Sequence, residues 1–197
     1  MLKNVLALSV IILAILQGPF IYFYTWGLGA LFLLGPYILA GFFLSALLLH
    51  QIAAKRGRTT KFHVIALVFS ITIGATSLFS EAYIEKIDWH LRKNQRKEII
   101  AKLKNGNLKY NPDKSTFYLE KFKYSLISNG GNDIVIQLGA KNQLTVTFFI
   151  NRGFLDHYSA FVYTNDPDEI KRIENYIRLR VKGDNFKIEK NWYRLNY

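Results

Sequence analysis

The first 80 residues contain no aspartate or glutamate, and this constrains the fold more than any other feature of the chain. Their five lysines and arginines lie at residue 3 and between residues 55 and 61, so three long apolar runs are left. An α-helix rises about 1.5 Å per residue, and about 20 apolar residues cross the hydrocarbon of a bilayer. The sequence therefore predicts a bundle of three transmembrane helices at residues 5–26, 29–49 and 62–83, the last including Glu81 at its end.

The bases between the second and third predicted spans set the expected orientation. Lys55, Arg56, Arg58 and Lys61 lie in a short loop, and short loops rich in such residues stay on the cytoplasmic side of the membrane. Three spans then place the N-terminus in the cytoplasm and residues 84–197 outside it. Many bases follow the third span, but long translocated domains largely escape this rule. The three spans predict a multi-pass membrane protein. No Asn-x-Ser/Thr sequon occurs, and this favours a bacterial cytoplasmic (inner) membrane.

The pairs Gly18–Pro19 and Gly35–Pro36 fall within the first two predicted spans, at a similar depth. Each proline removes a backbone donor and frees a carbonyl, so both pairs predict helix kinks. One interpretation is a hinge or a small outward cavity. The other is close helix packing, with Gln17 or Thr25 donating to a freed carbonyl. Apart from Glu81, no charged residue lies within a predicted span, which argues against an ion or proton pathway.

Residues 84–197 predict an extracytoplasmic α+β domain. Residues 81–197 hold all 14 acids and 21 bases, which leaves a net charge of +7. Residues 80–106 predict a juxtamembrane helix with apolar residues on one stripe. Its bases Arg92, Lys93, Arg96 and Lys97 predict a membrane-surface basic helix among lipid headgroups. The alternative is a solvated connector whose apolar stripe packs on the following sheet.

Short β-branched and aromatic segments between turn residues predict strands at 115–120, 122–128, 133–139, 143–151 and 157–164. "SNGGND" at residues 128–133 predicts a hairpin, and the short connections make the sheet antiparallel. Asp166 and Pro167 predict the start of a helix that Gly183 ends. Residues 185–197 alternate again and predict a last strand. The expected domain is an antiparallel sheet of about five to six strands with one helix packed on it.

The candidate binding residues gather around the strand at 157–164. Side chains two residues apart point to the same face of a strand, so His157, Ser159, Phe161 and Tyr163 would form a polar and aromatic face, with Arg152 nearby. Asp156 directly precedes His157, and adjacent side chains diverge, so we expect no catalytic residue here. The chain has no cysteine and four scattered histidines, so we expect no metal site, no cofactor and no enzyme activity.

These features together predict a membrane-anchored binding module of the bacterial cell envelope. The expected partners are membrane lipids and a protein or an anionic envelope polymer, and not nucleic acid, because no RNA-binding signature occurs. One version is an immunity-type protein that binds a toxin outside the cytoplasm. The alternatives are an envelope- or lipid-associated enzyme or assembly factor, or a subunit of a larger membrane complex. The oligomeric state stays open.

Overall fold

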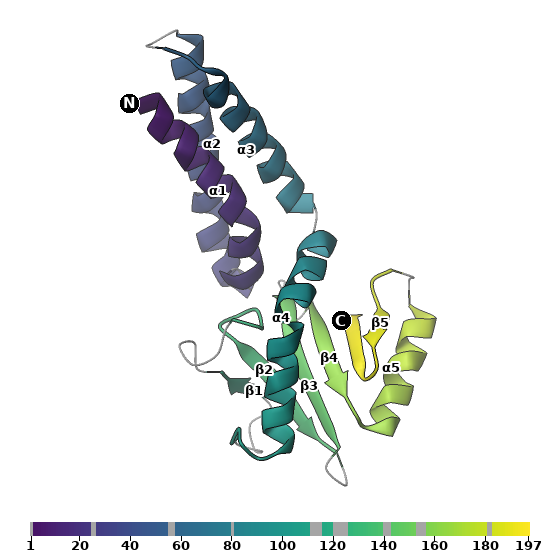
Figure 1. Ribbon diagram of the computed structural model, residues 1–197. Coiled ribbons are helices and arrows are strands. Elements are labelled where there is room, and N and C mark those ends of the chain that lie inside the picture. The colour runs from purple at the N-terminus through teal and green to yellow at the C-terminus, as the bar shows by residue number, and fades with distance from the viewer. Residues whose placement is uncertain are drawn as a thin grey trace. The chain divides into compact units, whose positions relative to one another are not determined.

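The structure, a computed structural model, divides into two compact units, Met1–Lys86 and Ile87–Tyr197, called here the first and second units. Figure 1 shows their helices and strands. Bases Lys55 and Arg56 and most of the strand predicted at 122–128 lie outside the described residues. The structure describes residues 2–24, 27–54, 58–79, 81–110, 116–119, 126–139, 143–152, 157–180 and 183–197.

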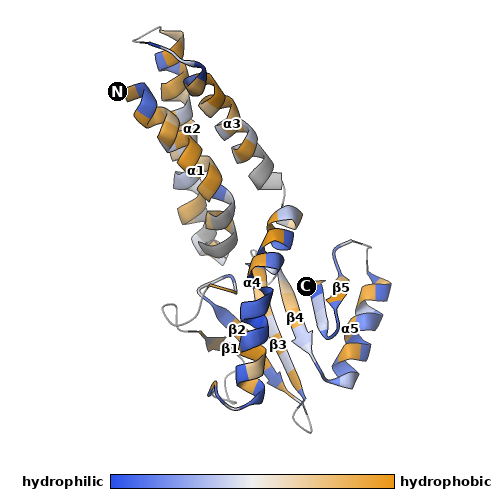
Figure 2. Cartoon of the chain, in the orientation of Figure 1, coloured by the Kyte–Doolittle hydropathy of each residue, from blue (hydrophilic) through white to orange (hydrophobic). Residues whose placement is uncertain are grey.

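The first unit holds three long apolar helices, α1 (Leu2–Tyr24), α2 (Gly27–Ala53) and α3 (Lys61–Phe79). Figure 2 shows the apolar residues that dominate all three. Small residues at the centre let the helix backbones approach closely. The buried core of this unit consists of Leu6, Ala7, Val10, Leu48 and Ala66.

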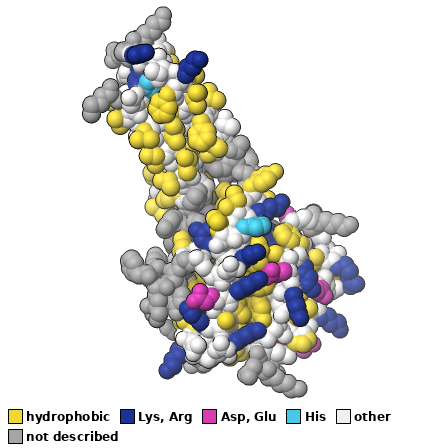
Figure 3. All heavy atoms as spheres, viewed as in Figure 1, with side chains coloured by type: hydrophobic (Ala, Val, Ile, Leu, Met, Phe, Trp, Pro, Cys, Tyr) yellow, Lys and Arg dark blue, Asp and Glu magenta, His cyan; other side chains and the backbone are white. Residues whose placement is uncertain are grey.

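Among the described residues, α2 is the one helix that is long and apolar enough to cross a membrane. The described apolar stretches of α1 and α3, Leu2–Gly18 and Lys61–Gly74, are shorter. The structure therefore supports one candidate span where the sequence predicts three, and the multi-pass topology stays a prediction. Figure 3 shows hydrophobic side chains covering the visible face of these helices.

Polar side chains tie the start of α1 to the start of α3. The Lys3 ammonium donates to the Thr59 hydroxyl over 2.6 Å. His63 is buried, and its Nδ1 accepts from the Thr60 N–H at 3.0 Å, so Nε2 carries the proton and donates to Asn4 Oδ1 at 2.8 Å. These bonds satisfy polar groups at the end of an otherwise apolar bundle.

Helix α4 (Glu81–Lys104) confirms the helix predicted at residues 80–106, and its residues from Ile87 onward belong to the second unit. It ends where the sequence predicts, because Gly106 adopts a φ of 68° and the Asn107 N–H bonds the Lys102 carbonyl at 2.9 Å. Its buried apolar residues are Trp89, Ile99, Ile100 and Leu103.

The second unit contains a six-stranded antiparallel sheet with the order β1-β2-β3-β4-β6-β5. The last predicted strand is in fact two strands: Asn191 takes a φ of 67°, so the chain reverses in a hairpin between them. The turn at 128–133 leads into β2 as predicted, but β2 pairs with β1, and Leu126 and Ile127 are not in a strand. The strands are β1 (Thr116–Tyr118), β2 (Asp133–Leu138), β3 (Leu144–Arg152), β4 (Tyr158–Thr164), β5 (Phe186–Glu189) and β6 (Trp192–Asn196).

Helices cover both faces of this sheet, where the sequence predicts one packed helix. Trp89 of α4 lies against Phe161, with the ring centroids 4.9 Å apart. Helix α5 (Pro167–Leu179) covers the opposite face through Ile173, which packs with Ala160 and Val162. The predicted connector α4 is thus a layer of the core, because its apolar stripe meets the apolar face of β4.

The predicted start of α5 is confirmed. The Asp166 carboxylate accepts from the Asp168 N–H at 3.0 Å and from the Glu169 N–H at 3.5 Å, and Pro167 occupies the first turn. The Glu169 carboxylate pairs with Arg172 through two bonds of 2.6 and 2.7 Å. The helix ends at Leu179, before the predicted Gly183.

We expect the second unit to lose stability between pH 10 and pH 12. Burial raises the pKa of Tyr197 to about 12, and burial also raises the pKa of Tyr158, whose ring centroid lies 4.7 Å away. An unfolded tyrosine has a pKa of about 10. The tyrosine of the unfolded chain therefore ionises at a lower pH than Tyr197 in the folded unit. The free energy of unfolding should fall by about 2 kcal/mol across this window.

Chemical denaturation of the full chain in micelles at a series of pH values measures this loss. Tyr197→Phe should reduce the decline in the free energy of unfolding above pH 10, and Tyr158 should leave a smaller residual decline. Equal declines in the wild type and the variant would contradict the assignment to Tyr197.

Candidate functional site

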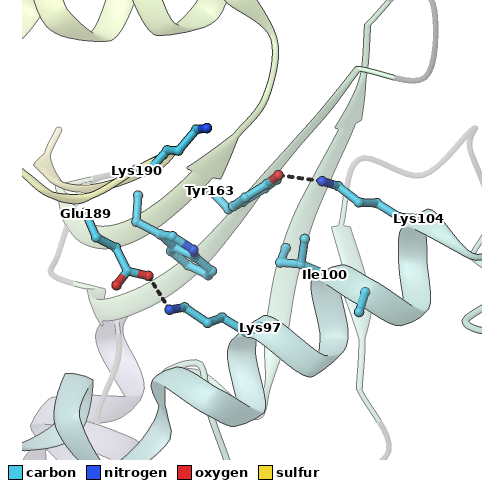
Figure 4. Close-up of a pocket in the computed structure, with 8 residues that line it drawn as sticks. Lys97, Ile100, Lys104, Tyr163, Glu189 and Lys190 are labelled. Carbon is cyan, nitrogen blue, oxygen red and sulfur yellow. Dashed lines mark hydrogen bonds and ion pairs between the residues drawn. The ribbon is translucent and has the colours of Figure 1, made fainter.

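The second unit carries a pocket of about 480 Å³ beside the C-terminal half of α4. We call it the basic pocket, because three lysines border it (Figure 4). It lies where α4 approaches the end of β4, the start of β6 and the turn between β5 and β6. The lining residues are Lys97, Ile100, Ala101, Lys104, Tyr163, Glu189, Lys190 and Trp192.

The helical repeat places the α4 residues of this pocket together. Residues three and four apart share one face of a helix, so Lys97, Ile100 or Ala101, and Lys104 follow one another along the pocket wall. Ile100 turns toward the sheet and is 5% exposed, while Ala101 and both lysines are exposed. The result is an apolar wall with a cation at each end.

The sheet supplies the aromatic floor. Tyr163 of β4 pairs with Trp192 of β6, and both are buried with ring centroids 5.3 Å apart. Glu189 and Lys190 come from the end of β5 and the turn that follows it, whose reversal depends on Asn191.

Two of the three lysines bind polar groups of the pocket. The Lys104 ammonium donates to the Tyr163 hydroxyl over 2.6 Å and lies 4.9 Å from the centre of that ring. The Lys97 ammonium lies 2.5 Å from a Glu189 carboxylate oxygen, and both side chains are partly exposed. Within the part of the chain that the structure describes, Lys190 has no ion pair. Figure 4 shows the Lys97 and Lys104 interactions as dashed lines.

The structure brings only Tyr163 of the predicted binding residues to this pocket. Ser159, Phe161 and Tyr163 share the face of β4 that α4 covers, and each is at least nine-tenths buried. The sequence predicts an open sheet face on which a ligand could reach Ser159 and Phe161. The structure does not have this open face, because α4 covers both residues. The sequence leaves open whether this helix packs on the sheet, because the helix precedes β4 by more than 50 residues. His157 is exposed just before β4.

Arg152 holds the turn before β2 in place. Its Nη1 donates to Asp133 Oδ2 at 2.8 Å, and its guanidinium lies 4.2 Å from the centre of the Phe149 ring. A Cβ added at Gly130 would lie 2.7 Å from Arg152 Nη1. These contacts make Arg152 a packing residue of the second unit.

The prediction that Arg96 lies on a membrane-surface basic helix is wrong, because the Arg96 side chain is fully buried. It points toward the sheet with its guanidinium 4.7 Å from the centre of the Phe161 ring. Arg92 is partly exposed and pairs with Asp88 at 2.6 Å, and Lys97 pairs with Glu189. Lys93 is partly exposed. A membrane surface is therefore a prediction for Arg92, Lys93 and Lys97 and not for Arg96.

The two Gly-Pro pairs lie within continuous helices: α1 runs through Gly18–Pro19 and α2 through Gly35–Pro36. The Tyr37 hydroxyl of α2 donates to the Leu13 carbonyl of α1 at 2.5 Å. The Gln17 amide donates to the Gly74 carbonyl at 3.1 Å, and this bond links α1 to α3. Its acceptor is not a carbonyl that proline frees. The kinks themselves stay a prediction.

A cavity of about 440 Å³, called here the bundle cavity, lies among α1, α2 and α3. Most of its lining is apolar, and a Cβ added at Gly41 of α2 would meet no atom within 4 Å. A few polar side chains also line it: Gln17, Tyr37, Ser45 and Ser70.

The basic pocket presents positive charge and hydrogen-bond donors. Among the described residues, no group of three or more His, Cys, Asp or Glu could hold a metal ion. The ammonium groups supply positive charge, and the Tyr163 hydroxyl supplies a neutral donor. The sequence did not single out Lys104, Lys190 and Trp192, because only the fold brings these distant residues together.

Comparisons with known proteins give no relative for this fold or site. No protein-family model, no curated protein and no solved structure matches the chain.

Proposed function

We propose that this protein is a membrane-anchored, non-enzymatic binding module of the bacterial cell envelope. The observation that carries the proposal is the contrast between the two units. α2 exposes large apolar side chains such as Phe32 and Phe42, at 79% and 74% exposed. The second unit is a compact α+β fold with its own core and a basic pocket.

Lipid is the environment that suits the first unit. Soluble proteins rarely expose a contiguous apolar surface of this kind to water. In a bilayer the same surface contacts hydrocarbon instead of water. The proposed topology has three spans, an N-terminus in the cytoplasm and the second unit outside. The bases Lys3, Arg58 and Lys61 at one end of the bundle support this orientation.

The proposed partner presents an acidic surface. The chain carries a net charge of +12, and complementary charge speeds the encounter of two macromolecules. A toxin that acts outside the cytoplasm is one such partner, in which case the protein would confer immunity. An anionic envelope polymer is the other.

Single cysteines test the sidedness and the partner together, because the natural chain has no cysteine. Ala101→Cys lines the basic pocket and Lys171→Cys lies on α5, on the opposite face of the sheet. Both positions are exposed. A membrane-impermeant maleimide with a photo-crosslinker is applied to intact cells, which retain the native envelope.

Both cysteines should react before lysis, and light should form one defined adduct from position 101 and none from position 171. Labelling that requires lysis would contradict the proposed orientation. Labelling without an adduct, or with equal adducts from both positions, would contradict binding at the pocket side of the second unit.

The bundle cavity favours a second candidate, a lipid-associated assembly factor. Its apolar lining and its few polar side chains suit an acyl chain with a polar group. Recovery of a defined lipid with the purified protein, in place of a crosslinked partner, would favour this candidate.

A further inference from the structure

The basic pocket holds hydrogen-bond donors that the protein leaves available for a ligand. Lys190 has no hydrogen bond or ion pair within the described part of the chain, and it borders the pocket. The Tyr163 hydroxyl accepts from Lys104, so its own proton is left to donate. Lys104 has one bond to Tyr163 and can offer two further N–H groups. Lys104, Lys190 and Tyr163 thus line one pocket and each has a donor available for a ligand.

The charge of the lining suits a group with two negative charges. Three ammonium groups and one carboxylate leave a net charge of +2. The Glu189 carboxylate already neutralises Lys97, which shows how a single carboxylate occupies one lysine. Lys104 and Lys190 remain, and a phosphate monoester carries a charge close to −2 at neutral pH with three acceptor oxygens. A carboxylate would leave one of the two lysines unmatched.

The size and the floor of the pocket require more than a phosphate alone. Its volume of about 480 Å³ lies within the range of small-molecule sites, about 300–1,000 Å³. Trp192 and Ile100 present apolar surface beside the charged groups, and Ala101 leaves the wall of α4 open. An apolar or aromatic group attached to the phosphate can pack there.

We propose that the basic pocket binds a phosphate monoester attached to an apolar or aromatic group. Lys104 and Lys190 contact the phosphate oxygens, Tyr163 donates its hydroxyl proton to one of them, and Trp192 packs against the attached group. The inference rests on the proposed function as a binding module and names the ligand class of its site. The phosphate belongs to a soluble molecule or to a lipid headgroup.

The test is a calorimetric titration of the full chain in nanodiscs of zwitterionic lipid, with phenyl phosphate as the probe. Inorganic phosphate and benzoate are titrated in parallel. Phenyl phosphate should bind more tightly than both, because inorganic phosphate lacks the ring and benzoate lacks the second charge. Nanodiscs that contain phosphatidic acid distinguish the sources: weakened phenyl phosphate binding there indicates a lipid headgroup, and unchanged binding indicates a soluble monoester.

Lys104→Ala and Lys190→Ala should each weaken phenyl phosphate binding about tenfold or more, since bonds to charged groups are the strong ones. Tyr163→Phe should weaken it less and leaves the ring in place. Lys171→Ala on α5 is the matched control, because it removes the same charge from the opposite face and should leave the affinity unchanged.

Three results would overturn the inference: no saturable binding of phenyl phosphate, equal affinities for phenyl phosphate and benzoate, or an equal loss in Lys171→Ala and Lys190→Ala. If phenyl phosphate fails while position 101 still forms its crosslinked adduct, the ligand class is wrong and the binding module stands. If phenyl phosphate binds while no adduct forms, the pocket inference stands and the macromolecular partner is wrong.

Discussion

Replacing Arg96 by alanine should lower the free energy of unfolding of the second unit by about 3–5 kcal/mol. Arg96 has no exposed surface, and its Nη2 donates to Asp88, which is 2% exposed. Its Nε and Nη2 also donate to the Ile127 carbonyl, at 3.0 and 2.9 Å. The substitution therefore removes three bonds, opens a cavity and weakens the compensation of a buried carboxylate.

Denaturation of the full chain in micelles, followed by near-ultraviolet circular dichroism, measures this loss. Arg92→Ala is the matched control. It removes the other basic partner of Asp88, but that side chain is 26% exposed and its pair is worth less than about 1 kcal/mol. Equal losses in the Arg92 and Arg96 variants would show that burial of the Arg96–Asp88 pair is unimportant.

A double variant separates the charge from the packing. Arg96→Met keeps most of the side-chain volume but removes the buried cation that pairs with the Asp88 carboxylate. Adding Asp88→Asn removes the carboxylate charge, and replacing both ions of a buried pair is often close to neutral. The double variant should therefore be more stable than Arg96→Met alone. A double variant that is less stable would mean that the two substitutions act only through lost contacts.

The helices and most strands could be predicted from the sequence because their signals are local. The alternation in the strand at 157–164, the Asp166 cap and the glycine after α4 each depend on neighbouring residues. The hairpin at Lys190–Asn191 lacks the usual glycine, so the alternation of residues 185–197 alone predicts one strand, although asparagine tolerates the positive φ that Asn191 adopts.

The parts that could not be predicted depend on contacts between distant segments. Arg96 falls on the same stripe of α4 as Trp89 and Ile100, but a charged side chain suggests solvent unless its buried partner is known. Lys104 and Lys190 both line the basic pocket although they are 86 residues apart in the sequence. No local sequence pattern indicates that they lie near each other.

We expect Asn132→Ala to cost about 2–5 kcal/mol of the free energy of unfolding, for two reasons. First, the buried Asn132 Oδ1 accepts from the Ile127 N–H at 2.7 Å and from the Ser128 N–H at 3.1 Å. Leaving a buried donor unsatisfied costs about 1–3 kcal/mol. Second, Asn132 has a φ of 76°, a conformation that alanine adopts at a cost of about 1–2 kcal/mol.

Two further variants at this position divide the cost. Asn132→Asp keeps the acceptor oxygen but buries a carboxylate next to Asp133, so it should also lose stability. Asn132→Gly removes the acceptor but accepts the positive φ, so it should lie between Asn132→Ala and the wild type. If Asn132→Gly matches the wild type, the two bonds to the turn contribute nothing. If it matches Asn132→Ala, the backbone conformation contributes nothing.

The two predictions meet at Ile127, which connects α4 to the turn before β2. The Ile127 N–H donates to Asn132, and the Ile127 carbonyl accepts from Arg96. Each bond therefore fixes the position of Ile127 and favours the geometry of the other bond. Once either side chain is lost, the segment can shift and the remaining bond weakens. The double variant Arg96→Ala, Asn132→Ala should therefore lose less stability than the sum of the two single losses, by about 0.5–3 kcal/mol. Strict additivity in the same denaturation experiment would show that α4 and the turn are held independently.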